Sequence, residues 1–152
     1  MPNKFYKYGN PTGKFAAIQL SVVDTDAWRS LKSASQSLYI LIVLEWRGMK
    51  YNNNGKIQLS ARSAAERMGC SKDTAARAFR DLQAKGFLRV IKGASLGAAV
   101  MGKSPEYEIV ALSMPSNRLQ SNEDFKKWTE GDNFEVFNHP PKNPSGKNKP
   151  LS

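Results

Sequence analysis

The feature that most constrains the fold is the stretch SARSAAERMGCSKDTAARAFRDLQAKGFLRVIKG, which begins at residue 60. Ser60 is placed to cap a helix that runs to about residue 68, since serine accepts hydrogen bonds from the first turn of a helix. Gly69 then breaks the helix, because glycine adopts a left-handed turn conformation at little cost. Ser71 is placed to cap a second helix over residues 72–85, which Gly86 terminates. Two short helices joined by such a turn are typical of a helix-turn-helix.

The second helix of this pair has two distinct faces. Its inward face carries small and apolar residues at helical spacing, namely Ala75, Ala78, Phe79 and Leu82. Its outer face carries Lys72, Asp73, Ala76, Arg77 and Arg80. Any pair of helices in a bundle can show an inward stripe, but the basic residues of the outer face favour contact with a polyanion.

Two further segments determine which kind of helix-turn-helix this is. Residues 87–93 and 106–112 are expected to form β-strands, because they are rich in β-branched residues and partly alternate. The connection between them is rich in glycine and other small residues. A helix-turn-helix followed at once by a two-stranded hairpin predicts an α+β fold, a winged helix whose wing spans residues 93–105.

Residues 97–104, GAAVMGKS, match the phosphate-binding pattern G-x-x-x-x-G-K-[ST] at every fixed position. A functional P-loop lies between a strand and a helix, and the N-terminus of that helix holds the phosphates. Here Pro105 and a strand-like run follow, so we expect no ATP binding. In a wing, the same glycines allow close approach of the backbone, and Lys103 can meet a DNA phosphate.

The N-terminal part of the domain is expected to be mainly helical. Residues 14–20 read as a short strand or an extended lead-in. Residues 24–31 have the composition of a helix start, with Asp24 or Thr25 as the capping residue.

The next segment is expected to be the central helix of the core. Ser33 and Gln36 have the spacing of a capping box, and Gly48 marks the end of the segment. If residues 38–46 form a helix, nearly all of its faces are apolar, which is typical of a buried helix. A buried strand is the alternative interpretation. Residues 56–59 have the length of a minimal strand.

The chain therefore divides into a flexible basic arm at 1–14, a winged-helix domain at 15–115, a short helical extension at 116–137 and a disordered basic tail at 138–152. The extension contains Phe125 and Trp128, which are expected to pack either on the domain itself or on a second subunit. The second arrangement would make a homodimer.

Composition narrows the functional classes. The formal net charge of +10 favours a polyanionic partner, and nucleic acid is the commonest, although solubility alone can explain such a balance. Cys70 is the single cysteine and His139, in the tail, is the single histidine, so we expect no metal site, no cofactor and no enzymatic activity. The longest apolar run, residues 38–44, is too short to cross a bilayer, and no signal peptide is visible, so we expect a cytoplasmic, nucleoid-associated protein.

From about residue 15 to 112, the sequence resembles winged helix-turn-helix domains of plasmid and phage replication proteins and related small bacterial regulators. The residues that carry this resemblance are Phe15, Ile18, Trp28, Leu38, Tyr39, Ala65, Gly69, Ser71, Thr74, Leu82, Lys85, Gly86 and Phe87. The resemblance implies DNA binding through the second helix of the motif.

We therefore expect a sequence-specific regulator that binds double-stranded DNA, with helix 72–85 in the major groove. Arg77 and Arg80 are candidates for guanine contacts. The remaining candidate contacts are Ser71, Lys72, Asp73, Thr74 and Ala76 on or beside the same helix, and Arg62, Lys92 and Lys103 on phosphates. A replication-initiator or mobile-element module that uses the same contacts is the main alternative, and a winged helix that binds only proteins is a further one.

Overall fold

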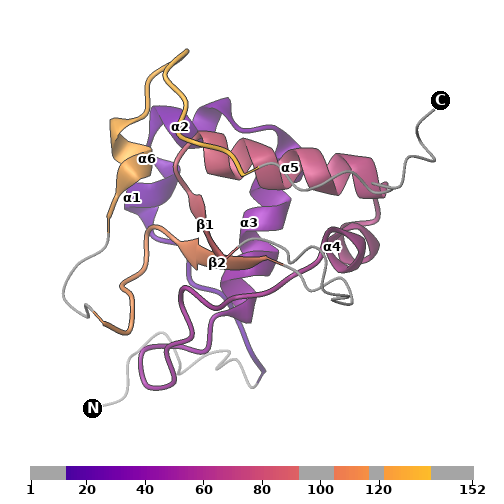
Figure 1. Ribbon diagram of the computed structural model, residues 1–152, viewed down its shortest axis with the longest axis vertical. Coiled ribbons are helices and arrows are strands. Elements are labelled where there is room, and N and C mark those ends of the chain that lie inside the picture. The colour runs from indigo at the N-terminus through magenta and orange to yellow at the C-terminus, as the bar shows by residue number, and fades with distance from the viewer. Residues whose placement is uncertain (1–12, 93–104, 117–121, 138–152) are drawn as a thin grey trace, which may run out of the picture.

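The protein was analysed as a computed structural model, which describes residues 13–92, 105–116 and 122–137. Within these ranges the fold is α+β, with six helices and one two-stranded antiparallel sheet, an arrangement compatible with a winged helix (Figure 1). The helices are α1 (Leu20–Val23), α2 (Asp26–Ser30), α3 (Ser33–Glu45), α4 (Ala61–Met68), α5 (Lys72–Ala84) and α6 (Asp124–Lys127), and the strands are β1 (Leu88–Lys92) and β2 (Glu106–Ile109).

Helix α3 is the central element, as expected. It stands upright in Figure 1, where α5 crosses near its upper end, and it packs against both α4 and α5. Leu38 and Ile42 are completely buried, whereas Ile40 on the opposite side is 45% exposed. The helix ends at Glu45 rather than at Gly48, and Trp46 is its C-cap residue.

The predicted capping box at the start of α3 is wrong. Ser33 is the first helical residue, and the N-cap residue, Lys32, makes no side-chain capping bond. The carboxylate of Asp81 on α5 takes over this role, because its Oδ2 accepts hydrogen bonds from the Lys32 backbone N (3.1 Å) and from Ser35 Oγ (2.6 Å). The cap of α3 thus comes from another helix, and it ties α3 to α5.

Three predicted caps are confirmed. Thr25, Ser60 and Ser71 each accept a hydrogen bond from the backbone N–H three residues later, at 3.0 to 3.1 Å. The expected alternative cap, Asp24, is instead the C-cap residue of α1. Residues 14–19 form a lead-in without strand pairing among the described residues, and α1 follows it.

The predicted hairpin strands pair as expected. β1 and β2 run antiparallel, with Leu88 opposite Ile109 and an irregularity between Val90 and Lys92. The expected strand at 56–59 is reduced to a single bridge between Ile57 and Tyr107, so it adds no full third strand. Of the predicted wing, residues 93–104 lie outside the described residues.

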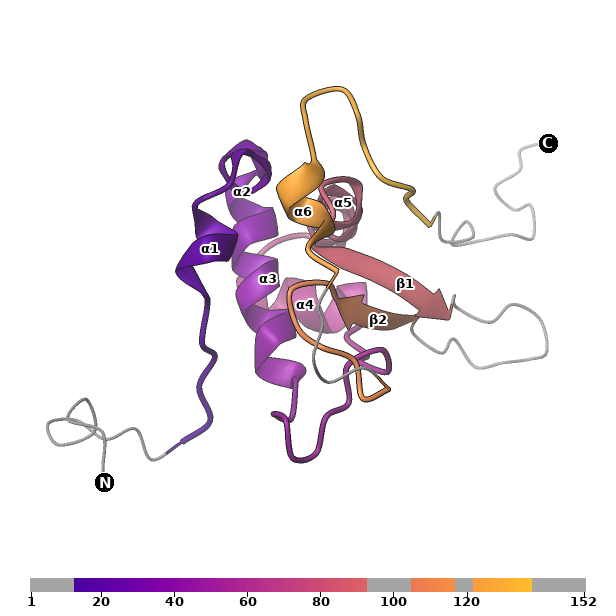
Figure 2. The ribbon, with the colours of Figure 1, turned by 90° about the vertical axis from the view of Figure 1, so that its left-hand side faces the viewer.

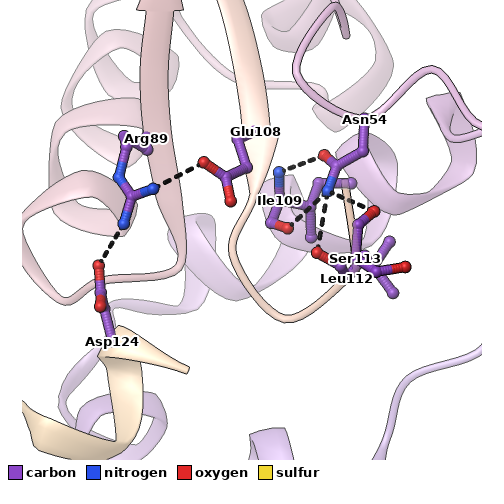
Figure 3. Close-up of polar contacts among 7 residues, drawn as sticks. All are labelled: Asn54, Arg89, Glu108, Ile109, Leu112, Ser113 and Asp124. Atoms are coloured by element: carbon purple, nitrogen blue, oxygen red, sulfur yellow. Dashed lines mark hydrogen bonds and ion pairs between the residues drawn. The ribbon is translucent and has the colours of Figure 1, made fainter. Parts of the chain in front are cut away.

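A buried asparagine fixes the turn that precedes this bridge. Asn54 is 2% exposed, and its Oδ1 accepts a hydrogen bond from the Ile109 backbone N at 2.7 Å (Figure 3). Its Nδ2 donates to the backbone oxygens of Ile109 and Leu112 at 3.0 and 3.1 Å. Because these groups are removed from water, the asparagine supplies the partners that the end of β2 would otherwise lack.

The C-terminal extension packs on the domain of the same chain. Phe125 is 2% and Trp128 8% exposed, and the Phe125 ring stacks on Phe87 with centroids 5.2 Å apart. Arg89 on β1 pairs with Glu108 (2.8 Å) and with Asp124 on α6 (2.7 Å), as Figure 3 shows. Burial raises the pKa of Glu108, and the neighbouring Arg89 opposes this rise. Of the two expected arrangements, packing within one chain is the one observed for these two aromatic residues.

The inward face of α5 is expected to dominate the stability of the fold. Phe79 is 2% exposed and its ring stacks on Tyr107 with centroids 5.2 Å apart, so Phe79→Ala should leave a cavity and lose roughly 3–5 kcal/mol of unfolding free energy. Urea denaturation followed by circular dichroism measures this loss. Arg80→Ala, the change at the next, exposed position, should stay within about 0.5 kcal/mol of wild type. Equal losses in the two variants would contradict the assignment of the inward and outer faces.

Candidate nucleic-acid interface

The turn between α4 and α5 has the geometry that the sequence predicts. Gly69 has a φ of +72°, a left-handed conformation in which a side chain would be strained. The Cys70 backbone N donates to the Ala65 oxygen at 3.0 Å, which closes the end of α4. Ala64 and Ala75 are completely buried, and α4 packs on α5. The small side chains therefore let the two helices approach closely.

The two faces of α5 are separated as expected. All four residues of the predicted inward stripe are buried. Lys72, Asp73, Arg77 and Arg80 are exposed, and Thr74 and Ala76 are half-buried beside them. The exposed face thus combines two arginines with small neighbours, which leaves the guanidinium groups accessible.

The basic residues of α4 and α5 differ in whether they form ion pairs. On α4 and at the end of α5, Arg67 pairs with Glu45 (3.1 Å) and Lys85 pairs with Asp81. Within the described ranges, by contrast, none of the other basic residues of the two helices makes an ion pair, namely Arg62, Lys72, Arg77 and Arg80. The fold uses the first two cations for its own stability and leaves the other four exposed to solvent.

The N-terminal end of α5 is fixed by two hydroxyl side chains. Ser71 Oγ accepts from the Thr74 backbone N (3.0 Å) and donates to Thr74 Oγ1 (2.9 Å). The Ser71 hydroxyl is therefore engaged by the helix cap, whereas the Thr74 hydroxyl keeps its own hydrogen for donation. Contacts of either residue with DNA remain predictions.

Most of the predicted DNA contacts lie on α5 or directly before it, and three lie on other segments. Arg62 is exposed at the start of α4, and Lys92 ends β1, where its backbone pairs with Glu106. Lys103 and the P-loop match at 97–104 lie outside the described residues. The residues that follow this match form β2 after Pro105, so the expectation of a strand there, rather than a P-loop helix, is confirmed.

One element beside α5 was not expected from the sequence. The backbone N of Phe134 donates to the Ala84 oxygen (2.9 Å), and the backbone N of Phe137 donates to Oε1 of Gln83 (2.8 Å). Gln83 is 1% exposed, and Figure 1 shows the segment crossing α5. Residues 134–137 therefore form a strap on the C-terminal half of α5. Gln83 also donates to the Phe79 oxygen of its own helix. A single glutamine in the sequence does not indicate that its side chain bonds to Phe137, which lies far along the chain.

Comparisons with protein families, with curated proteins and with solved structures give no match for this chain. None of the helices in the described residues is long and apolar enough to span a membrane.

The position of α5 depends on the ionisation of Asp81, which gives a pH-dependent prediction. Burial alone would raise the pKa of Asp81, but hydrogen bonds from Lys85, Ser35 and the Lys32 backbone hold that pKa below its usual value. The ionised form is thus favoured in the folded state, so its contribution to stability is present at neutral pH and is lost as the pH falls through the depressed pKa.

Asp81→Asn should therefore lower the free energy of unfolding at pH 7. The difference from wild type should shrink as the pH falls below about 3.9, the ordinary pKa of an aspartate. Urea denaturation of both proteins at several pH values between 7 and 3 measures this difference. A gap that stays constant with pH would show that the charge of Asp81 is not what holds the two helices together.

Proposed function

We propose that this chain is a winged-helix protein that binds double-stranded DNA sequence-specifically and acts as a transcriptional regulator, without enzymatic activity. The observation that carries the proposal is the outer face of α5, where Arg77 and Arg80 are exposed and make no ion pair among the described residues. Arginine side chains on one helix face, three residues apart, can each form the two-donor contact that distinguishes guanine in the major groove.

The shape of α5 suits this role. The helix has 13 residues and is thus about 20 Å long, and an α-helix of this kind fits the major groove of B-DNA. Ala76 is small enough to let the helix approach base edges, and Asp73 and Thr74 are placed to read neighbouring bases or to set the register. Lys72, at the start of the helix, shares this role, and Ser71 directly before it is a further candidate contact.

The remaining contacts would come from the flanks of α5. Arg62 on α4 would contact the phosphate backbone on one side. Lys92, at the end of β1, and Lys103, in the wing at 93–105, would contact it on the other. Under this proposal, the segment 97–104 serves as a wing and not as a nucleotide site. A homodimer through residues 116–137 would have to use the exposed side of that extension, because Phe125 and Trp128 are buried in their own chain.

Substitution of an arginine that contacts bases should change DNA affinity differently from substitution of a cation that contacts phosphates. Arg77→Ala or Arg80→Ala should cost about 1–3 kcal/mol in binding to the preferred site and should barely change binding to random DNA. Arg62→Ala should weaken both by similar factors, because phosphates are alike in every sequence. Selection of bound duplexes from a random pool supplies the preferred site, and competition with scrambled duplexes measures the variants.

Arg29→Ala on α2 is the matched control, because Arg29 is exposed and pairs with Asp26 on the surface. Its DNA affinity should equal that of wild type. If Arg62 governed sequence preference while both α5 arginines behaved as phosphate contacts, the assignment of α5 as the reading helix would be wrong. A selected site that functions in a replication origin rather than a promoter would favour the initiator alternative.

Binding should also depend strongly on salt. If roughly six phosphates are neutralised, the logarithm of the binding constant should fall with the logarithm of the salt concentration at a slope of about −5. Replacing the tail lysines Lys142, Lys147 and Lys149 should make this slope shallower without changing site preference. Fluorescence anisotropy on one duplex across a salt series measures the slope. An affinity that does not change with salt would argue for a protein-binding winged helix.

A further inference from the structure

A hollow on the described surface lies at the C-terminal end of α3. It is about 650 Å³ in volume and lies between the lead-in at 13–17 and the C-terminal end of α3. Asp81 of α5 is bonded to the N-terminal end of α3, whereas the hollow is lined by Val43, Trp46 and Arg47 at the other end of that helix. Figure 2 shows the lead-in and α3 on the same side of the ribbon. The apolar part of its lining consists of Phe15, Ala16, Ala17, Val43, Trp46, Tyr51 and Leu112.

The hollow is apolar inside and positively charged around its edge. Phe15 is 55% and Tyr51 67% exposed, and both line the same hollow, so together they form an apolar surface rather than isolated exposed residues. Lys14 and Arg47 belong to the lining, and Lys50 Nζ lies 5.5 Å from the centroid of the Tyr51 ring. Among the residues that the structure describes, no acidic residue lines the hollow, and these three cations make no ion pair.

The lead-in offers a second, independent feature. In Figure 2 it is drawn as an extended trace below α1, and its side chains alternate, with Ala16 and Ile18 half-buried and Phe15 and Ala17 exposed. None of the backbone N–H and C=O groups of residues 14–18 makes a hydrogen bond within the described ranges. An extended backbone with unused hydrogen-bonding groups is a template to which a second extended peptide can pair.

We infer that this groove binds an acidic, extended peptide segment of a partner protein. The peptide backbone would pair with residues 14–18, an aromatic or aliphatic side chain would fill the hollow between Phe15 and Tyr51, and carboxylates would face Lys14 and Arg47. Single-stranded nucleic acid could also use exposed aromatics and cations. The extended backbone of residues 14–18 favours a peptide instead, because an extended peptide offers a matching series of N–H and C=O groups.

The test uses the full-length protein and a phage-displayed library of random peptides, about twelve residues long. Enriched peptides are synthesised, and their affinities are measured by fluorescence anisotropy. We expect them to combine Asp or Glu with an aromatic or aliphatic residue. Arg47→Glu and Tyr51→Ala should each weaken their binding at least about tenfold. Lys127→Glu on α6, the same charge reversal at another exposed site, should leave it unchanged.

Three outcomes would overturn the inference. Enriched peptides without acidic residues, or with equal affinity for all variants, would exclude the groove as an acidic-peptide site. A dT12 oligonucleotide that binds more tightly than the peptides, and loses affinity in Tyr51→Ala, would make the groove a single-strand site. The third outcome concerns a full-length variant in which Phe5, Tyr6 and Tyr8 are replaced by serine. If this variant binds the peptides tenfold more tightly than wild type, the chain's own arm competes for the groove.

Duplex binding by the same variants separates this inference from the proposed function. Tyr51→Ala should bind the preferred duplex as wild type does, because Tyr51 lies away from α5. Failure of the peptide selection with duplex binding intact would overturn only the groove, and failure of duplex binding with peptide binding intact would overturn only the DNA-binding proposal.

Discussion

The arrangement of the whole domain depends on the aromatic cluster around Phe87. This residue is completely buried, and its ring packs against Trp28 of α2 (5.8 Å between centroids), Tyr39 of α3 (5.7 Å) and Phe125 of α6 (5.2 Å). Phe87 itself lies between α5 and β1, directly after Gly86, whose φ of +87° turns the chain. The cluster therefore joins α2, α3, α5, α6 and β1 at one point. Each aromatic pair contributes about 0.5–1.5 kcal/mol to stability beyond the burial of its surface.

The cluster explains why α5 presents a defined face. Its C-terminal part is held by Phe87 and by the bonds of Asp81 to α3, and the helix also packs on α4. These contacts set the orientation of the helix, so Arg77 and Arg80 lie on its exposed face. Such preorganisation lowers the entropic cost of recognition. Exposed charges that the fold leaves unpaired are of little use to stability, which is why they favour a role in binding.

The features that could be predicted from the sequence are those that depend on near neighbours. The caps at Ser60 and Ser71 and the turn at Gly69 follow from bonds that span three to five residues, and all three are observed. The features that could not be predicted depend on distant partners. The cap of α3 comes from Asp81, 49 residues away from Lys32, and so the local serine spacing gave a wrong capping box. The strap on α5 likewise depends on Gln83 and Phe137, 54 residues apart.

Helix α3 links the two surfaces to which we assign binding roles, and its two ends are fixed by different contacts. Its N-terminal end is bonded to α5 through Asp81, whereas at its C-terminal end Trp46 Nε1 donates to Asn52 Oδ1 at 2.9 Å. Asn52 Nδ2 in turn donates to the Ser113 backbone oxygen at 3.1 Å, which attaches this end to the segment after β2. The wall of the groove is thus set by bonds that do not involve α5. Under the two proposals, α5 would contact DNA near the N-terminal end of α3, and the groove near its C-terminal end would bind a protein partner.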